Sequence, residues 1–301
     1  MLTGMCAAPA SLKASSTLLP VSFFTLIDSI RRNGMISEPL RSGHALEAPR
    51  APVTQKRRNR IDTDKVIERP YLPRASVAPS AECPDGSKHH SQKYRDYSVM
   101  QQHCIYWDGD SDGVIWPLDT WRGFRDLGFN LLFCFLATIV IHATLSLPTR
   151  LAMSYIPDPF LRIYIETIHA NKHGSDSGAF DTEGRFVPCK FEDMWTKYTA
   201  TNPRGIPRTS MNLYELWLFT RGNRLAMDLF GWVAGFLEWV ATFLLVQQDG
   251  MVDKEDVRRV LDGSLFFEIR LARKSDQGWN KGWGLGGDGF IGGERLLPFG
   301  L

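Results

Sequence analysis

The sequence predicts a mainly helical protein, in which a helical, EF-hand-like core carries an apolar membrane-inserting segment and follows a disordered N-terminal arm. Three observations support this prediction. An acidic loop with calcium-binding spacing lies at 108–119, an uncharged apolar stretch follows at 127–147, and the first 95 residues show weak hydrophobic periodicity. The first two indicate a calcium site beside a lipid-facing element, and the third indicates a segment without a core of its own.

These features divide the chain into three parts. The arm is rich in Pro, Ser, Ala and Arg, and the tail is rich in Gly, so neither is expected to fold alone. The core contains an EF-hand, an apolar segment and a C-terminal helical part. The predicted boundaries are 1–95 for the arm, 96–274 for the core (EF-hand 96–126, apolar segment 127–160, helical part 161–274) and 275–301 for the tail.

Overall composition excludes some functions. The 35 basic and 33 acidic residues nearly cancel, so the sequence gives no case for nucleic acid as a partner. The five cysteines are scattered and form no Cys-x-x-Cys pair, so we expect neither a disulfide framework nor a zinc site. A reducing compartment fits this pattern best.

The calcium loop is the strongest motif. Asp108, Asp110 and Asp112 occupy positions 1, 3 and 5 of a 12-residue EF-hand loop, and Gly113 occupies position 6, where the chain turns sharply. Hard carboxylate oxygens at this spacing converge on one cation. The alternative is an acidic surface turn without a metal.

The end of this loop departs from the usual pattern. Val114 at position 7 offers its backbone carbonyl, and Asp119 stands at position 12, where a Glu normally binds Ca²⁺ through both oxygens. The shorter Asp119 predicts weaker calcium binding or competition by Mg²⁺. Two other segments, 181–186 and 249–252, have the middle of an EF-hand but lack acidic residues at position 1, so we interpret them as remnants or turns without a metal.

The apolar segment carries no Asp, Glu, Lys or Arg between Asp126 and Arg150, and Leu127–Leu147 is long enough to span a bilayer. The prolines after it are compatible with a hairpin that dips into the bilayer and returns, and a buried core helix is the alternative. His142 is unfavourable for a simple span. A second run, Leu229–Val246, has Glu238 as its single charge and predicts a buried or interfacial helix.

Further helices are indicated by periodicity and capping residues. Asn212 followed by Glu215 has the spacing of a capping box. The predicted helices cover 120–130, 163–172, 212–220 and 254–265.

A group of histidines suggests a metal or cofactor site. Glu166, His169 and His173 are spaced i, i+3, i+7, which places them on one face if the segment is an α-helix. His103 lies five residues before Asp108. Taken alone, such histidines more often have a structural or surface role.

Four blocks of sequence, taken in order, resemble the caleosin family. They cover nearly all of residues 95–270. The blocks are 103–123 with the calcium loop and Thr120–Arg125, 168–178 continued by 181–188, 215–232 with its Glu-Leu-Trp, Thr-Arg-Gly-Asn-Arg and Phe-Gly-Trp runs, and 262–266.

The resemblance implies a fold, cofactors and an activity. Caleosins are helical, calcium-binding proteins of lipid droplets and endoplasmic reticulum. Many are haem peroxygenases that move an oxygen atom from a fatty acid hydroperoxide to an unsaturated lipid. The family's haem-associated histidines align with His103 and His173, so the resemblance implies that these two are catalytic and bind haem. His169 would be a further cofactor-binding residue that, with Glu166, orients an imidazole ring.

The resemblance also implies a calcium site at Asp108, Asp110, Asp112, Val114 and Asp119. The partners would be fatty acid hydroperoxides, unsaturated lipids and a membrane or lipid droplet surface, and an oligomer is compatible with the sequence. The chain differs from the family in having fewer prolines after its apolar segment, and its long arm has no readable family counterpart.

Oxygen transfer requires an iron with an open position, so one histidine is expected to be the proximal ligand and the other to be distal or to detach. The sequence does not indicate which. Two alternatives remain: a non-enzymatic, calcium-dependent coat or tether of lipid droplets, and a non-haem metal site at Glu166, His169 and His173. The second requires another Glu-x-x-His copy, which the sequence lacks. Residues 1–95 are expected to be dispensable for catalysis, and calcium is expected to position His103.

Overall fold

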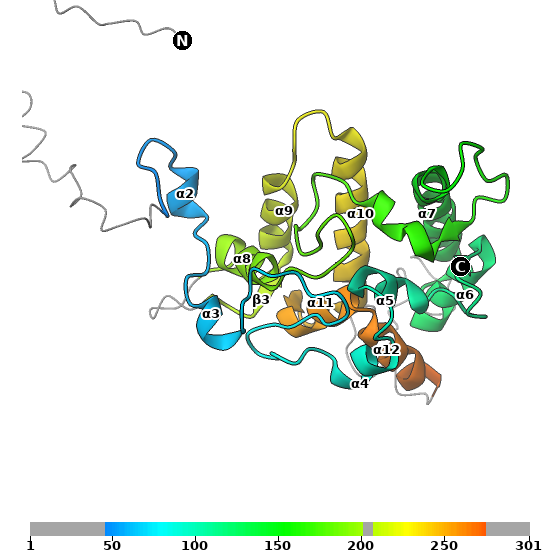
Figure 1. Ribbon diagram of the computed structural model, residues 1–301, viewed down its shortest axis with the longest axis horizontal. Coiled ribbons are helices and arrows are strands. Elements are labelled where there is room, and N and C mark those ends of the chain that lie inside the picture. The colour runs from blue at the N-terminus through cyan, green and yellow to red at the C-terminus, as the bar shows by residue number, and fades with distance from the viewer. Residues whose placement is uncertain (1–45, 201–206, 275–301) are drawn as a thin grey trace, which may run out of the picture. The chain divides into compact units, whose positions relative to one another are not determined.

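The computed structural model describes residues 46–200 and 207–274, which are predominantly helical (Figure 1). The chain divides between Ala48 and Pro49, and the helical core belongs to the part from Pro49 onward. The longer helices are α5 (Val99–Ile105), α6 (Pro117–Leu127), α7 (Leu131–Leu151), α8 (Pro188–Tyr198), α9 (Leu213–Gly222), α10 (Leu229–Val246), α11 (Lys254–Leu261) and α12 (Ser264–Lys274). The mainly helical class and its apolar segment are confirmed. The predicted tail at 275–301 lies outside the described residues.

Within the described residues, four short strands form two separate ribbons. β1 (Val114–Ile115) pairs antiparallel with β2 (Ile163–Tyr164), and Ile115 lies opposite Ile163. β3 (Ser210–Asn212) pairs antiparallel with β4 (Met251–Asp253), and Met211 lies opposite Val252. Because each strand has only two or three residues, the ribbons join neighbouring loops and do not form a layer of their own.

The helix between the calcium loop and the apolar segment begins earlier than predicted. Pro117 stands at the first turn of α6, where its missing N–H costs nothing. The helix ends at Gly128, whose φ of 100° requires a residue without a Cβ. The helix predicted at 120–130 is therefore shifted, and α7 starts afresh after Asn130, whose side chain accepts a hydrogen bond from the Phe133 N–H.

The other predicted helices differ in outcome. The capping box of Asn212 and Glu215 is present at the start of α9, which confirms that prediction. The segment predicted as one helix at 254–265 breaks into α11 and α12 at Gly263, whose φ is 79°. The segment predicted as a helix at 163–172 begins as β2 and continues as the 3₁₀ helix η1 (Ile165–Asn171), because its first two residues pair with β1.

The hydrophobic core lies between α5, α6 and the C-terminal helices. Its largest fully buried side chains include Phe191, Trp195, Phe219 and Leu265. A second, smaller cluster lies around the β1–β2 ribbon and contains Cys104, Ile115, Ile163, Ile165 and Ile168. The calcium loop and its partner strand therefore pack on a hydrophobic cluster that is separate from the main core.

The structure corrects the predicted boundary of the N-terminal arm. Residues 1–45 lie outside the described residues, whereas 49–95, with the short helices α2 (Val53–Lys56), α3 (Thr63–Val66) and α4 (Lys88–Lys93), pack on the core. Ile67 and Ala78 are buried, and the backbone of Arg74 pairs with that of Phe186. The polar composition misled the prediction because the charged groups of this segment pair with groups on the core.

Those charged groups form one network. Arg60 donates to the buried Glu192 at 2.5 Å, and Lys254 donates to the same carboxylate at 2.7 Å. Glu82, from the arm, accepts from Lys254 at 2.5 Å. Two segments of the arm therefore supply charges that balance buried charges on α8 and α11.

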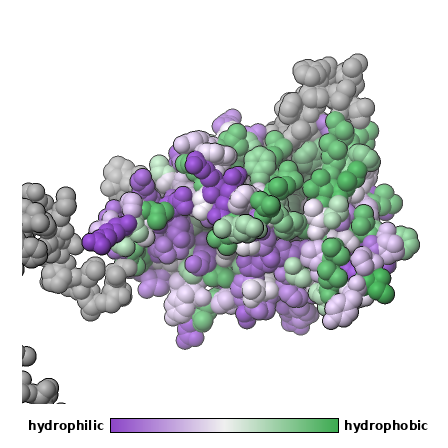
Figure 2. Space-filling view, turned by 90° about the horizontal axis from the view of Figure 1, so that it is seen from above, coloured by the Kyte–Doolittle hydropathy of each residue, from purple (hydrophilic) through white to green (hydrophobic). Residues whose placement is uncertain are grey.

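Two helices, α7 and α10, are long and apolar enough to cross a membrane by length and composition. Only 22% of the most apolar window of α7 and 28% of that of α10 are buried within the protein. Figure 2, which looks down from the top of Figure 1, shows hydrophobic residues gathered on the side where these helices lie. Pro148 lies inside α7 without ending it, so the chain does not turn back within this helix.

One side of α7 is nevertheless fixed to the protein. His142 is buried, with its two ring nitrogens 2.7 Å from the Thr120 hydroxyl on α6 and 2.7 Å from the Leu161 carbonyl oxygen. Thr149 accepts a hydrogen bond at its carbonyl from the Thr167 hydroxyl at 2.8 Å. His142, which made a simple span unfavourable, is therefore one of the residues that attach α7 to the core.

Candidate functional site

The three acidic residues at the start of the calcium loop converge. One carboxylate oxygen from each of Asp108, Asp110 and Asp112 lies within 4.8 Å of the others. Asp108 is buried, and it accepts hydrogen bonds from the Gly113 N–H at 2.9 Å and the Asp112 N–H at 3.2 Å. Gly113 has a φ of 83°, which allows the sharp turn. These residues fit a Ca²⁺ ion, which prefers clustered oxygen ligands.

Electrostatics in the loop also favour a cation. Burial raises the pKa of Asp108, the two backbone N–H groups oppose this, and the neighbouring Asp110 and Asp112 raise the pKa further. Three carboxylates at this spacing repel one another, and a divalent cation between them would remove the repulsion.

Asp119 caps the helix that follows the calcium loop. Its carboxylate accepts a hydrogen bond from the Trp116 N–H at 3.0 Å and so caps the start of α6. Among the described residues, the acidic cluster consists of Asp108, Asp110 and Asp112, and Asp119 is not part of it. Val114 lies in β1, where the backbone of the loop is fixed by its pairing with Tyr164.

His103 lies on α5 and faces the C-terminal helices. Its Nδ1 is 2.7 Å from the Val260 carbonyl oxygen, so Nδ1 carries the proton and the lone pair of Nε2 is available. Burial lowers the pKa of this histidine and keeps the ring neutral. The edge of Phe266 packs against the ring, with 5.2 Å between ring centroids. Gly263, between α11 and α12, packs closely on the backbone of α5, because a Cβ at this position would lie 2.8 Å from the His103 Cα.

His173 lies beyond the end of η1, next to the start of α10. Its Nδ1 is buried and has no hydrogen-bond partner, although Asp228 Oδ2 is 3.9 Å away. That carboxylate is already used by Ser175, whose N–H and hydroxyl donate to it at 2.8 and 2.6 Å. The ring of Phe230 stands edge-on to the imidazole at 5.9 Å. A buried ring nitrogen without a partner costs free energy unless a ligand or a proton transfer uses it.

The expected common face of Glu166, His169 and His173 is not present. Glu166 and His169 lie one turn apart on η1, and both are exposed. The helix ends at Asn171, and Lys172 is extended, so His173 points from a different stretch of backbone. The prediction from the i, i+7 spacing is wrong because η1 is a short 3₁₀ helix that does not continue as an α-helix to His173.

The structure gives His103 and His173 different neighbours. His103 contacts Val260 and Phe266, whereas His173 contacts Asp228 and Phe230. Sequence reasoning missed Asp228, which both caps α10 through the Gly231 N–H and faces His173. An Asp directly before a long apolar run is a helix-start signal that could have identified it.

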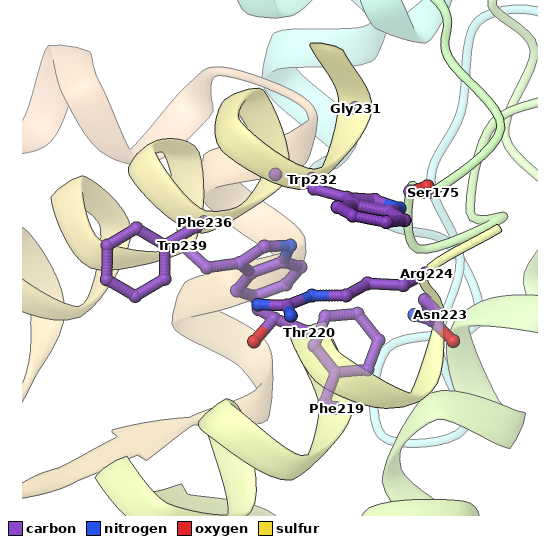
Figure 3. Close-up of a pocket in the computed structure, with 10 residues that line it drawn as sticks. Ser175, Phe219, Thr220, Asn223, Arg224, Gly231, Trp232, Phe236 and Trp239 are labelled. Carbon is purple, nitrogen blue, oxygen red and sulfur yellow. The ribbon is translucent and has the colours of Figure 1, made fainter. Parts of the chain in front are cut away.

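A small cavity lies beside the start of α10, and Figure 3 shows the side chains that line it. Its volume is about 10 Å³, which is about the space of one water molecule. The side chain of Arg224 extends between Trp232 and Phe219 (Figure 3). Neither His103 nor His173 lines this cavity, and its volume is far below the several hundred Å³ that a haem macrocycle needs, so the cavity is not a haem pocket. The imidazole nitrogens of the two histidines are nevertheless of the kind that binds haem iron.

Comparisons with known proteins identify the family. The family model described as caleosin related protein matches residues 95–270. A peroxygenase of Lilium longiflorum is 36% identical over 76% of this chain and 92% of its own length. A probable peroxygenase 4 of Arabidopsis thaliana is 36% identical over 59% of this chain and 88% of its own.

A third relative, a probable inactive peroxygenase-like protein of Arabidopsis thaliana, is 29% identical over 53% of this chain and 74% of its own length. The search of solved structures found no match. The matched region includes the calcium loop, both histidines and the apolar helices α7 and α10. This chain therefore belongs to the caleosin family.

Proposed function

We propose that this protein is a calcium-binding peroxygenase that transfers an oxygen atom from a fatty acid hydroperoxide to an unsaturated lipid at a lipid droplet or endoplasmic reticulum surface. The relatives named peroxygenase support the reaction class. The observation that carries the site assignment is the buried, unpartnered Nδ1 of His173 beside Asp228. The reaction balances as hydroperoxide plus alkene giving alcohol plus epoxide.

His103 is the better candidate for holding haem. Its Nδ1 donates to a backbone carbonyl, which fixes the tautomer and leaves Nε2 free to bind a metal, as is usual for metal-ligating histidines. Its lowered pKa keeps that nitrogen unprotonated near neutral pH. Haem held by His103 would supply the redox chemistry that cleavage of a hydroperoxide O–O bond requires.

His173 is the better candidate for moving a proton. Its unpartnered Nδ1 can take the hydroperoxide proton and return it to the alcohol oxygen that leaves, as a general acid–base does. The Asp228 carboxylate at 3.9 Å stabilises the positively charged ring between the two transfers. The cavity beside Gly231 holds about 10 Å³, so Arg224 and Trp232, which line it, would have to move before it could admit a lipid chain.

The apolar helices support attachment to a lipid surface. The exposed side of α7 carries Phe135, Leu136 and Ile139, each about half exposed, while its other side is fixed through His142. A helix held in this way fits the water–lipid boundary better than a free bilayer span, because crossing would break both hydrogen bonds of His142. We therefore propose interfacial attachment by α7, with α10 as a second contact.

Optical spectra and turnover of three variants test the assignment. We expect His103→Gln to lose the Soret band and His173→Gln to keep it while turnover falls by about 100-fold, the usual size of a general acid–base contribution. His169→Gln is the matched control, because His169 is exposed, and it should keep both. Retention of the wild-type spectrum by His103→Gln would contradict the assignment of the ligand.

A non-enzymatic, calcium-dependent lipid droplet coat is the second candidate. The small cavity favours it, as does the relative described as a probable inactive peroxygenase-like protein. The two candidates differ in one measurement. A purified wild-type protein without a Soret band and without epoxide formation, but still bound to droplets, would support the coat.

A further inference from the structure

The segment that pairs with the calcium loop has the backbone of a second EF-hand loop. Ile115 is residue 8 of the calcium loop and lies opposite Ile163, so the same count makes Ile156–Thr167 the partner loop. Leu161 then stands at position 6, and its φ of 54° matches the positive φ of Gly113. Tyr164 at position 9 is the N-cap of η1, just as Trp116 at position 9 is the N-cap of α6.

The second ribbon repeats this arrangement. Met211 lies opposite Val252, and the residues that follow them, Asn212 and Asp253, are the N-caps of α9 and α11. Gly250, two residues before Val252, has a φ of 75°. The second ribbon therefore joins the starts of α9 and α11 as the first joins those of α6 and η1, although residues 201–206, between α8 and β3, lie outside the described residues.

The partner loop lacks the free carboxylates that a calcium ion would need as ligands. Its positions 1 and 5 are Ile156 and Phe160, which offer no carboxylate. Asp158 at position 3 is nearly inaccessible, with 1% of its side chain exposed. Its carboxylate accepts from Arg162 Nε at 2.7 Å, from the Tyr164 hydroxyl at 2.6 Å and from the Phe160 N–H at 2.9 Å. The guanidinium supplies the positive charge that a bound cation would otherwise supply.

Arg162 also contacts the calcium loop. Its guanidinium lies over the ring of Trp116 at 4.8 Å, and Trp116 joins β1 to α6. It further lies over the rings of Phe160 at 5.5 Å and Tyr164 at 5.8 Å. One side chain therefore binds the buried carboxylate of the partner loop and stacks on the residue where the calcium loop meets its exit helix.

We propose that Arg162 is a built-in cation of the metal-free partner loop, and that it holds the β1–β2 pair in the arrangement that calcium binding at Asp108–Asp119 requires. Arg162 is thus a positioning residue for the calcium site. The inference rests on calcium binding by that loop and is independent of the peroxygenase reaction. It implies that the partner loop binds no calcium while Arg162 is present.

Charge must be separated from positioning in the test. Removing Arg162 alone would take a positive charge away from the calcium loop and so favour calcium binding. Loss of its contacts with Asp158 and Trp116 would disfavour calcium binding. The double variant Arg162→Gln with Asp158→Asn removes one charge of each sign and leaves the net charge unchanged. Calcium titration of the full-length protein by calorimetry, in detergent, then measures how much these contacts contribute to calcium affinity.

The second ribbon provides a matched control. Arg208, two residues before β3, donates to Glu215 at the start of α9, so Arg208→Gln with Glu215→Gln removes an equivalent pair far from the calcium loop. We expect the Arg162–Asp158 variant to bind calcium about tenfold more weakly, within the usual range of coupling between sites. The Arg208–Glu215 variant should stay within about twofold of wild type.

Four outcomes are informative. Equal affinity in the Arg162–Asp158 variant and wild type, or an equal loss in both double variants, overturns the proposal. Arg162→Lys, which keeps the charge but loses the flat guanidinium stacked on Trp116, should show an intermediate loss and serves if the double variant does not fold. Absence of calcium binding in wild type would refute the calcium function itself, and is therefore distinguishable from failure of this inference.

A gain of binding tests the loop geometry directly. Carboxylates introduced as Ile156→Asp, Phe160→Asp and Thr167→Glu restore positions 1, 5 and 12. Together with Arg162→Ser they should create a second calcium site, visible as doubled stoichiometry. The same three carboxylates with Arg162 retained should leave the stoichiometry at the wild-type value. A quadruple variant without a second site would show that the loop lacks EF-hand geometry.

Discussion

At the scale of single residues, His173 depends on a glycine in the helix opposite. A Cβ at Gly231 would lie 2.6 Å from His173 Nδ1 and would also overlap the Asp228 carboxylate. Gly235, one turn further along α10, faces the same histidine from a longer distance, because a Cβ there would lie 3.7 Å from His173 Cε1. The two glycines thus differ in how much space they leave beside the imidazole.

We predict that Gly231→Ala impairs turnover and lowers the free energy of unfolding by about 1–3 kcal/mol, the usual cost of overpacking. Gly235→Ala is the control, and it should be neutral or should raise stability by up to about 1 kcal/mol because alanine favours the helix. Thermal unfolding and epoxide formation measure both effects. Full activity in Gly231→Ala would show that His173 is not held by this contact.

The buried His103 predicts how stability depends on pH. Burial lowers its pKa in the folded protein, so the unfolded chain binds the proton more readily. Stability should therefore be complete above the ordinary histidine pKa and should decrease as the pH falls from about 7.5 to about 5.5. Thermal midpoints across this range measure the slope, and His103→Gln should reduce it. An unchanged slope in the variant would assign the effect to other groups.

At the scale of elements, the segment at 49–95 is part of the fold. Arg60 and Glu82 balance the buried Glu192 and Lys254, so a chain that starts at Lys93 leaves two buried charges with fewer partners. Breaking a buried pair by removing one partner costs about 3–5 kcal/mol. We therefore expect residues 49–95 to be needed for folding, whereas composition alone predicted that residues 1–95 are dispensable for catalysis.

We predict that a chain starting at Lys93 is insoluble or unfolded, whereas one starting at Pro49 keeps its helical circular dichroism. Arg60→Met should reproduce much of the loss, because its guanidinium is close to Glu192. Arg69→Met is the control, since Arg69 pairs with Glu68 only at 3.9 Å on the exposed surface. Equal stability of the two truncated chains would mean that the arm contributes little.

At the scale of the whole molecule, local features were predictable and pairings between distant segments were not. The calcium loop, the capping box of α9 and the bounds of α10 depend on spacing within a few residues, and the sequence indicated each of them. The pairing of Ile115 with Ile163 and the contact of Arg60 with Glu192 depend on segments far apart in the chain. No local pattern encodes them, so the η1 segment and the arm were misread.

The candidate site divides in the same way. Asp108, Asp110 and Asp112 converge as their spacing predicted. His103 and His173 were placed by family resemblance, and their partners, Val260 and Asp228, come from helices that no spacing rule connects to them. The structure adds these partners, and the proposed metal-binding role of His103 and proton-moving role of His173 rest on them.

The last prediction concerns attachment by two helices. Leu136 and Ile139 on α7 are 53% and 49% exposed, and Val233 and Leu237 on α10 are 61% and 40% exposed. Lysines at these positions should leave folding intact, because the side chains are not buried in the core. Each pair of substitutions places two charges where lipid contact would otherwise bury apolar surface.

We expect the α7 pair alone and the α10 pair alone to weaken flotation with phospholipid-coated triacylglycerol droplets partially, and all four substitutions together to abolish it. Two contacts on one surface reinforce each other, since the first raises the effective concentration of the second. Leu271→Lys on α12 is the control, because Leu271 is 67% exposed and lies on neither apolar helix. Wild-type flotation of the α10 pair, combined with complete loss in the α7 pair, would identify α7 as the sole anchor.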